Sequence, residues 1–126
     1  MGWHSADVVR VFDNLINPPS YKRFVCVSPA EGWYFRINTK PWWKPNLPIP
    51  LERNKNCLDH DSHIELRIIE IYEIEIEEAI RVPDNMFGPI SNDDVKRLLA
   101  AVDAAPTFTP EQRDEIRANL ESVLSA

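Results

Sequence analysis

The sequence predicts an α+β fold in which a small β-barrel or curled sheet is covered by helices. Three observations carry this prediction. β-rich runs separated by turns occupy much of residues 1–82, a proline- and tryptophan-rich segment interrupts them at 40–56, and two amphipathic helical patterns follow at 91–103 and 110–124. With 126 residues, 44% of them hydrophobic, the chain fits one domain (1–126) that buries a core of its own.

The first element lies within residues 5–16, and its pattern allows two interpretations. β-branched residues at 7–12 favour a strand, whereas Ser5 as an N-cap favours a helix that runs to Ile16. The prolines at 18 and 19 end the element in either case, because the residue before a proline is disfavoured in helical conformation.

Residues 22–39 have the pattern of a β-hairpin with a proline- and glycine-containing turn between its strands. Lys22 and Arg23 stand at the start of the first strand, and Asn38 and Thr39 stand at the end of the second. A hairpin returns these four side chains to the same end of the sheet. They could therefore converge on one anionic ligand.

The second strand of this hairpin has a predicted core face and a predicted open face. Because side chains alternate along a strand, Trp33, Phe35 and Ile37 share one face and should form core. The same alternation leaves Tyr34 and Arg36 on the other face, available to a ligand.

The segment 40–56 contains four prolines, so it cannot form a helix and fits only at a sheet edge. We expect an extended, partly packed loop there. Trp42 and Trp43 beside Lys40 could stack single-stranded bases, although aromatic residues at this density more often pack into a core.

Alternating isoleucine and glutamate residues over 64–78 predict strands with a buried apolar face and a solvated acidic face. The phase changes near Tyr72, where we expect either a bulge or the meeting of two strands.

Farther on, Ser91 should cap the helix at 91–103. Thr109 should cap the helix at 110–124, with proline in its first turn.

The net charge of −6 argues against a general polyanion binder, but the charge is distributed unevenly. Residues 1–63 contain 8 Lys and Arg against 6 Asp and Glu, a balance of +2, whereas residues 64–126 contain 6 against 14, a balance of −8. An anion site therefore belongs in the first half.

Without a membrane-spanning run or a signal peptide pattern, we expect a cytoplasmic protein with no membrane contact. We also expect its two cysteines, Cys26 and Cys57, to be free thiols.

His60, Asp61 and Ser62 allow an acid–base and hydrogen-bonding group, with His60 able to titrate near neutral pH. The alternative is that Asp61 and Ser62 bind local backbone amides and fix the entry to the next strand.

The spacing of Cys57, His60 and His63 fits no established zinc pattern. We therefore expect no metal and no other cofactor.

Four stretches resemble the MazF, PemK and Kid toxin superfamily: DVVRV at 7–11, KRFVCVS at 22–28, INT at 37–39 and FGPIS at 87–91. The resemblance spans roughly residues 7–103 and implies an SH3-like barrel with the two late helices packed on it. The stretch DHDSHI at 59–64 is similar to a strand entry of uncharacterised relatives of these toxins, which implies a divergent branch of the superfamily.

This resemblance implies a toxin–antitoxin-type protein that acts on single-stranded RNA, as a metal-independent endoribonuclease. By position, Arg23 would stabilise the scissile phosphate while Thr39 and Asn38 hold it; a cognate antitoxin and a homodimer are the implied protein partners. The alternative is a catalytically inactive barrel that binds a protein in phage conflict or in a toxin system.

Overall fold

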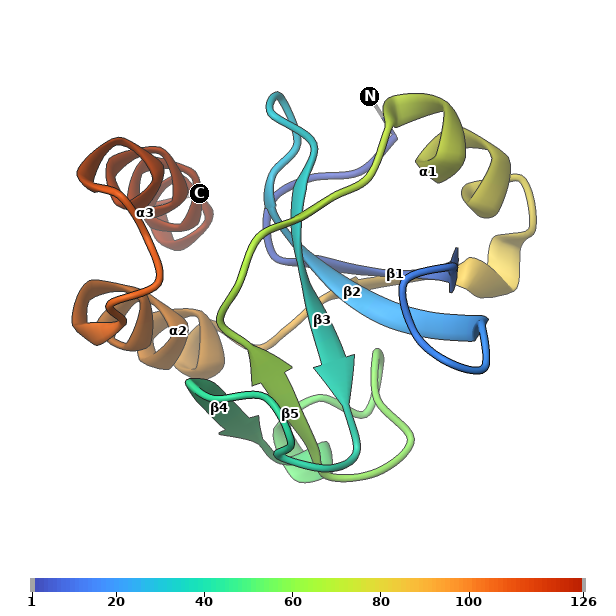
Figure 1. Cartoon of the computed structure of the whole chain (residues 1–126), viewed down its shortest axis with the longest axis horizontal. Helices are drawn as coiled ribbons and strands as arrows, with labels where there is room; N and C mark the ends of the chain where they lie inside the picture. The colour runs from blue at the N-terminus through green and yellow to red at the C-terminus, as the bar shows by residue number, and fades with distance from the viewer. Residues whose placement is uncertain (1, 126) are drawn as a thin grey trace.

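The structure is a computed structural model that describes residues 2–125 and has an α+β fold (Figure 1). The strands are β1 (Asp7–Asp13), β2 (Ser20–Ser28), β3 (Trp33–Asn38), β4 (Asn46–Ile49), β5 (Ser62–Glu65), β6 (Ile69–Glu70) and β7 (Met86–Pro89). The helices are α1 (Glu73–Ile80), α2 (Asn92–Ala104) and α3 (Pro110–Ser125), with short 3-10 turns η1 (Leu51–Arg53) and η2 (Pro83–Asn85).

All strands belong to one 7-stranded antiparallel sheet that curls into a half-barrel (Figure 1). The strand order is β4-β5-β3-β2-β1-β7, and the short β6 pairs with the opposite end of β3 from β5. The edge strands β4 and β7 each contain a proline, Pro48 and Pro89. The sheet therefore extends past residue 82, where the sequence pattern ended the barrel, because β7 pairs with β1.

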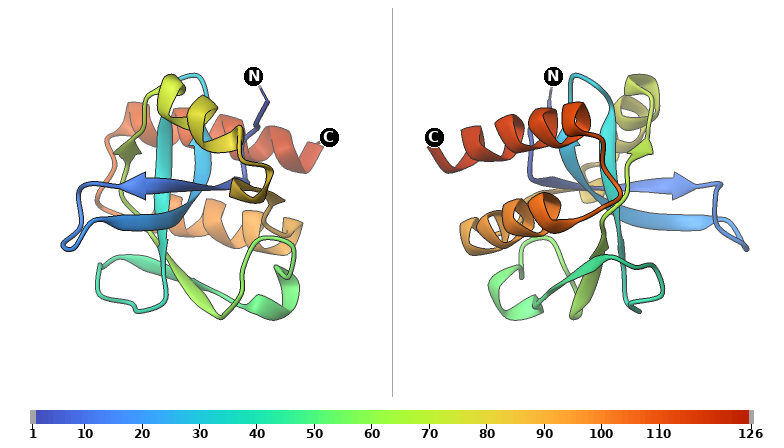
Figure 2. Two further views of the ribbon diagram at one scale, coloured as in Figure 1. Left: turned by 90° about the vertical axis from the view of Figure 1, so that its right-hand side faces the viewer. Right: turned by 60° about the vertical axis from the view of Figure 1, so that its left-hand side comes forward.

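The sheet is covered on both faces, so its central strands contribute to two hydrophobic clusters. Alternation along β2 directs Val25 and Val27 into the cluster under α2 and α3, and Phe24 and Cys26 into the cluster under α1. Figure 2 shows α2 and α3 side by side on one face of the sheet. We call these the α2/α3-side cluster and the α1-side cluster.

The first element is a strand, which decides between the two interpretations of residues 5–16. β1 runs Asp7–Asp13 and pairs antiparallel with β2 from Val8 opposite Val25 to Asp13 opposite Ser20. Its valines are buried on both faces of the sheet. Val8 lies in the α2/α3-side cluster, and Val9 and Val11 lie in the α1-side cluster.

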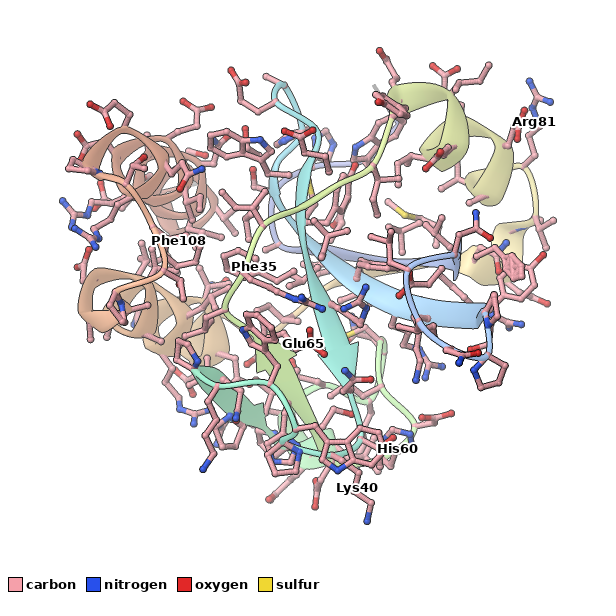
Figure 3. The ribbon with its side chains drawn as sticks, in the orientation of Figure 1. Phe35, Lys40, His60, Glu65, Arg81 and Phe108 are labelled. Atoms are coloured by element: carbon pink, nitrogen blue, oxygen red, sulfur yellow. The ribbon has the colours of Figure 1, made fainter. Side chains whose placement is uncertain are left out.

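The two C-terminal helices agree with the sequence prediction. Ser91 caps α2 by accepting a hydrogen bond from the Asp94 backbone, and Thr109 and Gln112 at α3 bond each other's backbone N–H groups in a capping box. Both helices pack into the α2/α3-side cluster, where Phe108 from the loop between them stacks on Phe35 of β3 (Figure 3).

The strand prediction for residues 69–78 was largely wrong. Only β6 (Ile69–Glu70) is strand, and α1 (Glu73–Ile80) is an acidic helix. Ile76 is fully buried and Ile80 packs one turn later, whereas Ile74 is 63% exposed, so the burial has helical spacing rather than alternation. Just before this helix, Leu66 and Ile68 pack on the α2/α3-side cluster whereas Ile69 and Ile71 lie in the α1-side cluster, so apolar residues face both sides of the sheet there.

The proline-rich segment lies at the sheet edge as expected, but it is more ordered than a loop. β4 pairs with β5 over residues 46–49, and η1 adds a turn at 51–53, where a helical conformation was excluded. Within residues 2–125, none of the helices has the length and apolar composition needed to span a bilayer.

Candidate functional site

A groove opens at the end of the sheet where β2 begins and β3 ends, and we call it the strand-end groove. Its volume is about 280 Å³. The residues that line it are Arg10, Tyr21, Lys22, Arg23, Ile37, Thr39, Asp59, His60 and Ser62. The structure thus brings together five side chains that the sequence singled out, Lys22, Arg23, Thr39, His60 and Ser62; His60 is labelled at this end of the molecule in Figure 3.

Strand register explains why these residues converge. Arg10 of β1 pairs with Arg23 of β2, Arg23 pairs with Ile37 of β3, and Ile37 pairs with Ile64 of β5. One rung of the sheet therefore aligns the two arginines beside the end of β3. Thr39 lies two residues beyond Ile37, next to the loop that enters β5.

Arg23 is oriented by an aromatic ring and by a carboxylate. Its guanidinium carbon lies 4.6 Å from the centre of the Phe87 ring, and its Nη1 donates to Asp59 Oδ1 at 3.0 Å. The Arg23 side chain is 25% exposed and the Asp59 side chain 63% exposed, so water screens this ion pair and its contribution is small. An anionic ligand can replace Asp59 while Phe87 still holds the plane of the guanidinium.

His60 lies between a hydrogen-bonding support and the open groove. Its Nδ1 is 3.1 Å from Ser62 Oγ, whose own hydrogen is donated to the His60 carbonyl, so in neutral imidazole the proton belongs on Nδ1. The other nitrogen, Nε2, lies 3.4 Å from Thr39 Oγ1 and 3.2 Å from Asp59 Oδ1. His60 can therefore accept a proton at Nε2, with Asp59 placed to stabilise the imidazolium that forms.

The strand-end groove is positive although the chain is acidic. Arg10, Lys22 and Arg23 line it with a single carboxylate, Asp59, which leaves an excess of two positive charges in a chain of net charge −6. Like charges on paired strands repel, and Arg10 lies directly opposite Arg23. Asp59 offsets one of these charges, and an anionic ligand would offset the others.

Five of the predicted site residues do not line the groove, and Asp61 and Lys40 are two of them. Asp61, expected as a catalytic residue, instead accepts a hydrogen bond from the Leu51 backbone N–H at 2.8 Å, in line with the alternative role as a local anchor. Lys40 is exposed and lines neither the groove nor the pocket beside it, although Figure 3 shows it at the same end of the molecule.

The expected open face of β3 is closed. Tyr34 is 1% exposed in the α1-side cluster, where burial raises the pKa of its hydroxyl well above the usual range. Arg36 is also 1% exposed and is bound by Asp13 and Glu65. Alternation gave the correct two faces but not their exposure, because the α1-side cluster covers Tyr34 and the ion pairs with Asp13 and Glu65 enclose Arg36.

Asn38 and Lys22 lie at the boundary between the groove and a second pocket. Lys22 Nζ donates to Asn38 Oδ1 at 3.3 Å, and the Asn38 amide donates to Glu65. Lys22 lines both pockets, whereas Asn38 lines only the second. Asn38 therefore positions Lys22 and does not reach the groove itself.

Sequence reasoning missed Arg10, Tyr21 and Asp59 as residues of this site. Arg10 carried a signal, since it is the one charged residue inside the apolar run of β1. The Arg10 guanidinium lies 4.9 Å from the Tyr21 ring centre, so these two form one wall together. Asp59 had no such signal, because only the fold brings it between Arg23 and His60.

The cysteines and histidines do not form a ligand cluster. Across residues 2–125, no three His, Cys, Asp or Glu side chains are arranged to hold a metal ion. Cys26 and Cys57 are both free and buried, as predicted for thiols with no partner. Burial raises the pKa of Cys26 to about 12 and that of Cys57 to about 11.

No family model, curated protein or solved structure matches this chain. The resemblance to the MazF and PemK toxins stays a prediction from the sequence.

Proposed function

We propose that this protein is a metal-independent endoribonuclease of the MazF and PemK toxin type, acting on single-stranded RNA in the strand-end groove. One observation carries the proposal: the groove combines an excess of two positive charges with a histidine whose Nε2 faces the open space. Cleavage by a ribose 2′-hydroxyl requires those two elements, a cation for the phosphate and a base for the proton.

The residues divide the reaction between them. His60 Nε2 takes the proton of the 2′-hydroxyl, whose oxygen attacks phosphorus and forms the O2′–P bond. The P–O5′ bond breaks, the leaving oxygen takes a proton from water, and the hydroxide that remains takes the proton back from His60. The products are a 2′,3′-cyclic phosphate and a 5′-hydroxyl end. Arg23 stabilises charge that develops on the phosphoryl oxygens, and Thr39 Oγ1, 3.4 Å from His60, orients the phosphate.

Asp59 has a different partner in each state of this scheme. In the free protein it lies 3.0 Å from Arg23 and 3.2 Å from His60. A bound phosphate takes its place on Arg23, which frees the Asp59 carboxylate to neutralise the imidazolium of His60. Because the Asp59 side chain is 63% exposed, this exchange needs no rearrangement of the fold.

Purified protein incubated with single-stranded RNA in the presence of EDTA tests the proposal. The wild type should produce fragments with 2′,3′-cyclic phosphate ends. Arg23→Ala should slow cleavage roughly 100-fold or more, as removal of a group that stabilises transition-state charge does elsewhere. His60→Ala should have a similar effect, because it removes the base that takes the proton of the 2′-hydroxyl.

Arg81→Ala is the matched control, because Arg81 is an exposed cation at the far side of the molecule from His60 (Figure 3). Its rate should equal that of the wild type. Intact RNA after incubation with the wild type would remove the nuclease proposal, as would equal rates for Arg81→Ala and Arg23→Ala.

A second candidate function, a catalytically inactive barrel that binds a protein, is favoured by a different surface. Between β1 and α1 lies a depression of about 290 Å³ that we call the acidic cleft. Phe12 and Val82 line it and are 44% and 54% exposed, and Glu75 and Glu78 line it beside them. Exposed apolar side chains ringed by carboxylates suit a partner segment with apolar and basic residues.

Co-expression with the product of a neighbouring gene tests this second function. A specific complex should be lost in Val82→Glu and kept in Arg23→Ala. The opposite pattern would assign the partner to the strand-end groove, and absence of any complex together with RNA cleavage would reject the inactive-barrel alternative.

A further inference from the structure

The second pocket lies beside the strand-end groove, and Lys22 lines both. We call it the tryptophan pocket; its volume is about 510 Å³, and its lining includes Lys22, Arg36, Trp42, Trp43, Glu65 and Arg67. It lies between the loop at 14–19 and the loop at 39–45. A chain bound along the end of the sheet would pass from one pocket to the other across Lys22.

The floor of the tryptophan pocket contains an incompletely bonded arginine. Arg36 is 1% exposed; its Nε donates to Asp13 at 2.6 Å and its Nη1 donates to Glu65 at 3.1 Å. Its Nη2 is buried and has no hydrogen-bond partner among the described residues, and the same is true of Trp43 Nε1. A buried donor without a partner is costly, so two such donors at one pocket indicate a ligand that supplies acceptors.

Charge balance sets the kind of acceptor. Arg36 and Arg67 both bind Glu65, and Asp13 supplies a second carboxylate to Arg36, so the floor is neutral overall. A further carboxylate or phosphate on this floor would be a buried charge whose one remaining counterion is Lys22, at the boundary with the strand-end groove. A carbonyl oxygen or ring nitrogen satisfies the free donors at no such cost.

The walls of the pocket fit a flat ring. Trp42 is 84% exposed, which leaves its indole ring free to stack on a ligand. The Arg67 guanidinium carbon lies 4.0 Å from the Trp43 ring centre, which fixes the second indole. Nucleobases stack on such rings, and their edges carry the acceptors that the floor requires.

We infer that the tryptophan pocket binds a guanine base of the RNA strand whose phosphate occupies the strand-end groove, an inference that rests on the proposed function. Guanine presents two acceptors, O6 and N7, on one edge, and arginine is their commonest partner. Adenine places an amino donor beside N7 and would meet the unpaired donors with another donor. The pocket therefore supplies base preference, and the groove supplies the reaction.

Binding of mononucleotides tests the base preference without any cleavage. In calorimetric titrations, guanosine and inosine 5′-monophosphates should bind with similar affinity, because both have O6 and N7. Adenosine 5′-monophosphate and the 7-deaza analogue of guanosine 5′-monophosphate should bind roughly tenfold or more weakly. Equal affinity for adenosine and guanosine monophosphates would overturn the inference.

Substitutions then locate the base. Trp42→Ala should weaken binding of guanosine 5′-monophosphate roughly tenfold, because stacking on the exposed indole is lost. Tyr72→Ala is the matched control, since Tyr72 is an aromatic residue, 73% exposed, on the α1 side. The indole resonances of Trp42 and Trp43 should shift on binding while that of Trp3, in the α1-side cluster, stays in place. Unchanged affinity in Trp42→Ala would place the base elsewhere and reject the pocket.

Two RNA arms separate this inference from the proposed function. Short RNAs that contain a single guanine should bind more tightly than the free mononucleotide and more tightly than the same RNA with adenine. If the free mononucleotide bound more tightly than the RNA that contains guanine, the natural ligand would be a nucleotide and not RNA. Selective guanine binding without any cleavage would support the guanine pocket and reject the nuclease. Cleavage with no guanine preference would support the nuclease and reject the guanine pocket.

Discussion

Replacing Asp94 with asparagine removes a buried negative charge that four other side chains bind. Asp94 has no exposed side-chain surface; Oδ1 accepts from Arg53 at 2.7 Å and Arg97 at 2.8 Å, and Oδ2 accepts from Asn54 and Ser91, both at 2.7 Å. These contacts tie the segment after β4 to the first turn of α2. Asparagine keeps the shape but loses the charge and one acceptor atom.

We expect Asp94→Asn to lower the free energy of unfolding by about 3 kcal/mol. Removal of one partner of a buried ion pair costs about 3–5 kcal/mol, and the lower end applies here because both arginines are 40% exposed and regain water. For a chain of this length, 1 kcal/mol corresponds to about 4 °C in melting temperature, so the variant should melt about 12 °C lower. Thermal unfolding followed by circular dichroism measures this shift.

The pH dependence gives an independent check on the same charge. Burial of Asp94 raises its pKa, but hydrogen bonds from Arg53, Asn54, Ser91 and Arg97 outweigh burial and hold the pKa below its ordinary range. A lowered folded-state pKa stabilises the fold fully above the unfolded value of about 3.9 and is lost as pH falls below it. The difference between wild type and variant should stay constant from pH 7 to pH 5 and shrink below about pH 4.

Asp93→Asn is the matched control, since Asp93 is the exposed neighbour in the same helical turn. It should cost less than about 1 kcal/mol, through the helix dipole alone. Equal losses for Asp93→Asn and Asp94→Asn, or a difference from wild type that does not change with pH, would refute the reasoning.

The remaining predictions concern α1 and the two thiols. Ile76→Ala should lower the free energy of unfolding by about 2–5 kcal/mol because Ile76 is fully buried, whereas Ile74→Ala, at 63% exposure, should change it by less than about 0.5 kcal/mol; equal losses in urea titrations would contradict the helix. Cys26 and Cys57 should resist a thiol-specific disulfide reagent at pH 8 until guanidinium unfolds the chain, since burial raises their pKa values to about 12 and 11 and leaves little thiolate; rapid labelling of the native protein would contradict this.

Local sequence signals predicted most of the fold where neighbouring residues decide the structure. The hairpin of β2 and β3 and the capped helices α2 and α3 depend on turn residues, alternation and caps, all of which lie within a few positions of each other. The strand prediction for the acidic segment at 73–80 was wrong because the alternation of glutamate and isoleucine over residues 73–76 fits a strand locally. Only packing of Ile76 and Ile80 on the sheet selects the helix.

The candidate site was partly predictable for the same reason. Arg23 and Thr39 meet because hairpin register returns their strand ends to one place, which the sequence shows. Asp59 and Arg10 come from other strands and loops, so their place in the groove depends on the whole sheet. Arg36 was assigned to an open face, since alternation says which way a side chain points and nothing about what covers it.

Both outermost strands of the sheet carry a proline, Pro48 in β4 and Pro89 in β7. Each proline deletes an amide hydrogen from a row that another polypeptide would otherwise use to extend the ladder. Strand addition is thereby discouraged at either margin, which guards against self-aggregation and amyloid-like stacking. At these two strands a companion molecule meets an interrupted row of main-chain amides, so side chains in the hollows offer it more contacts.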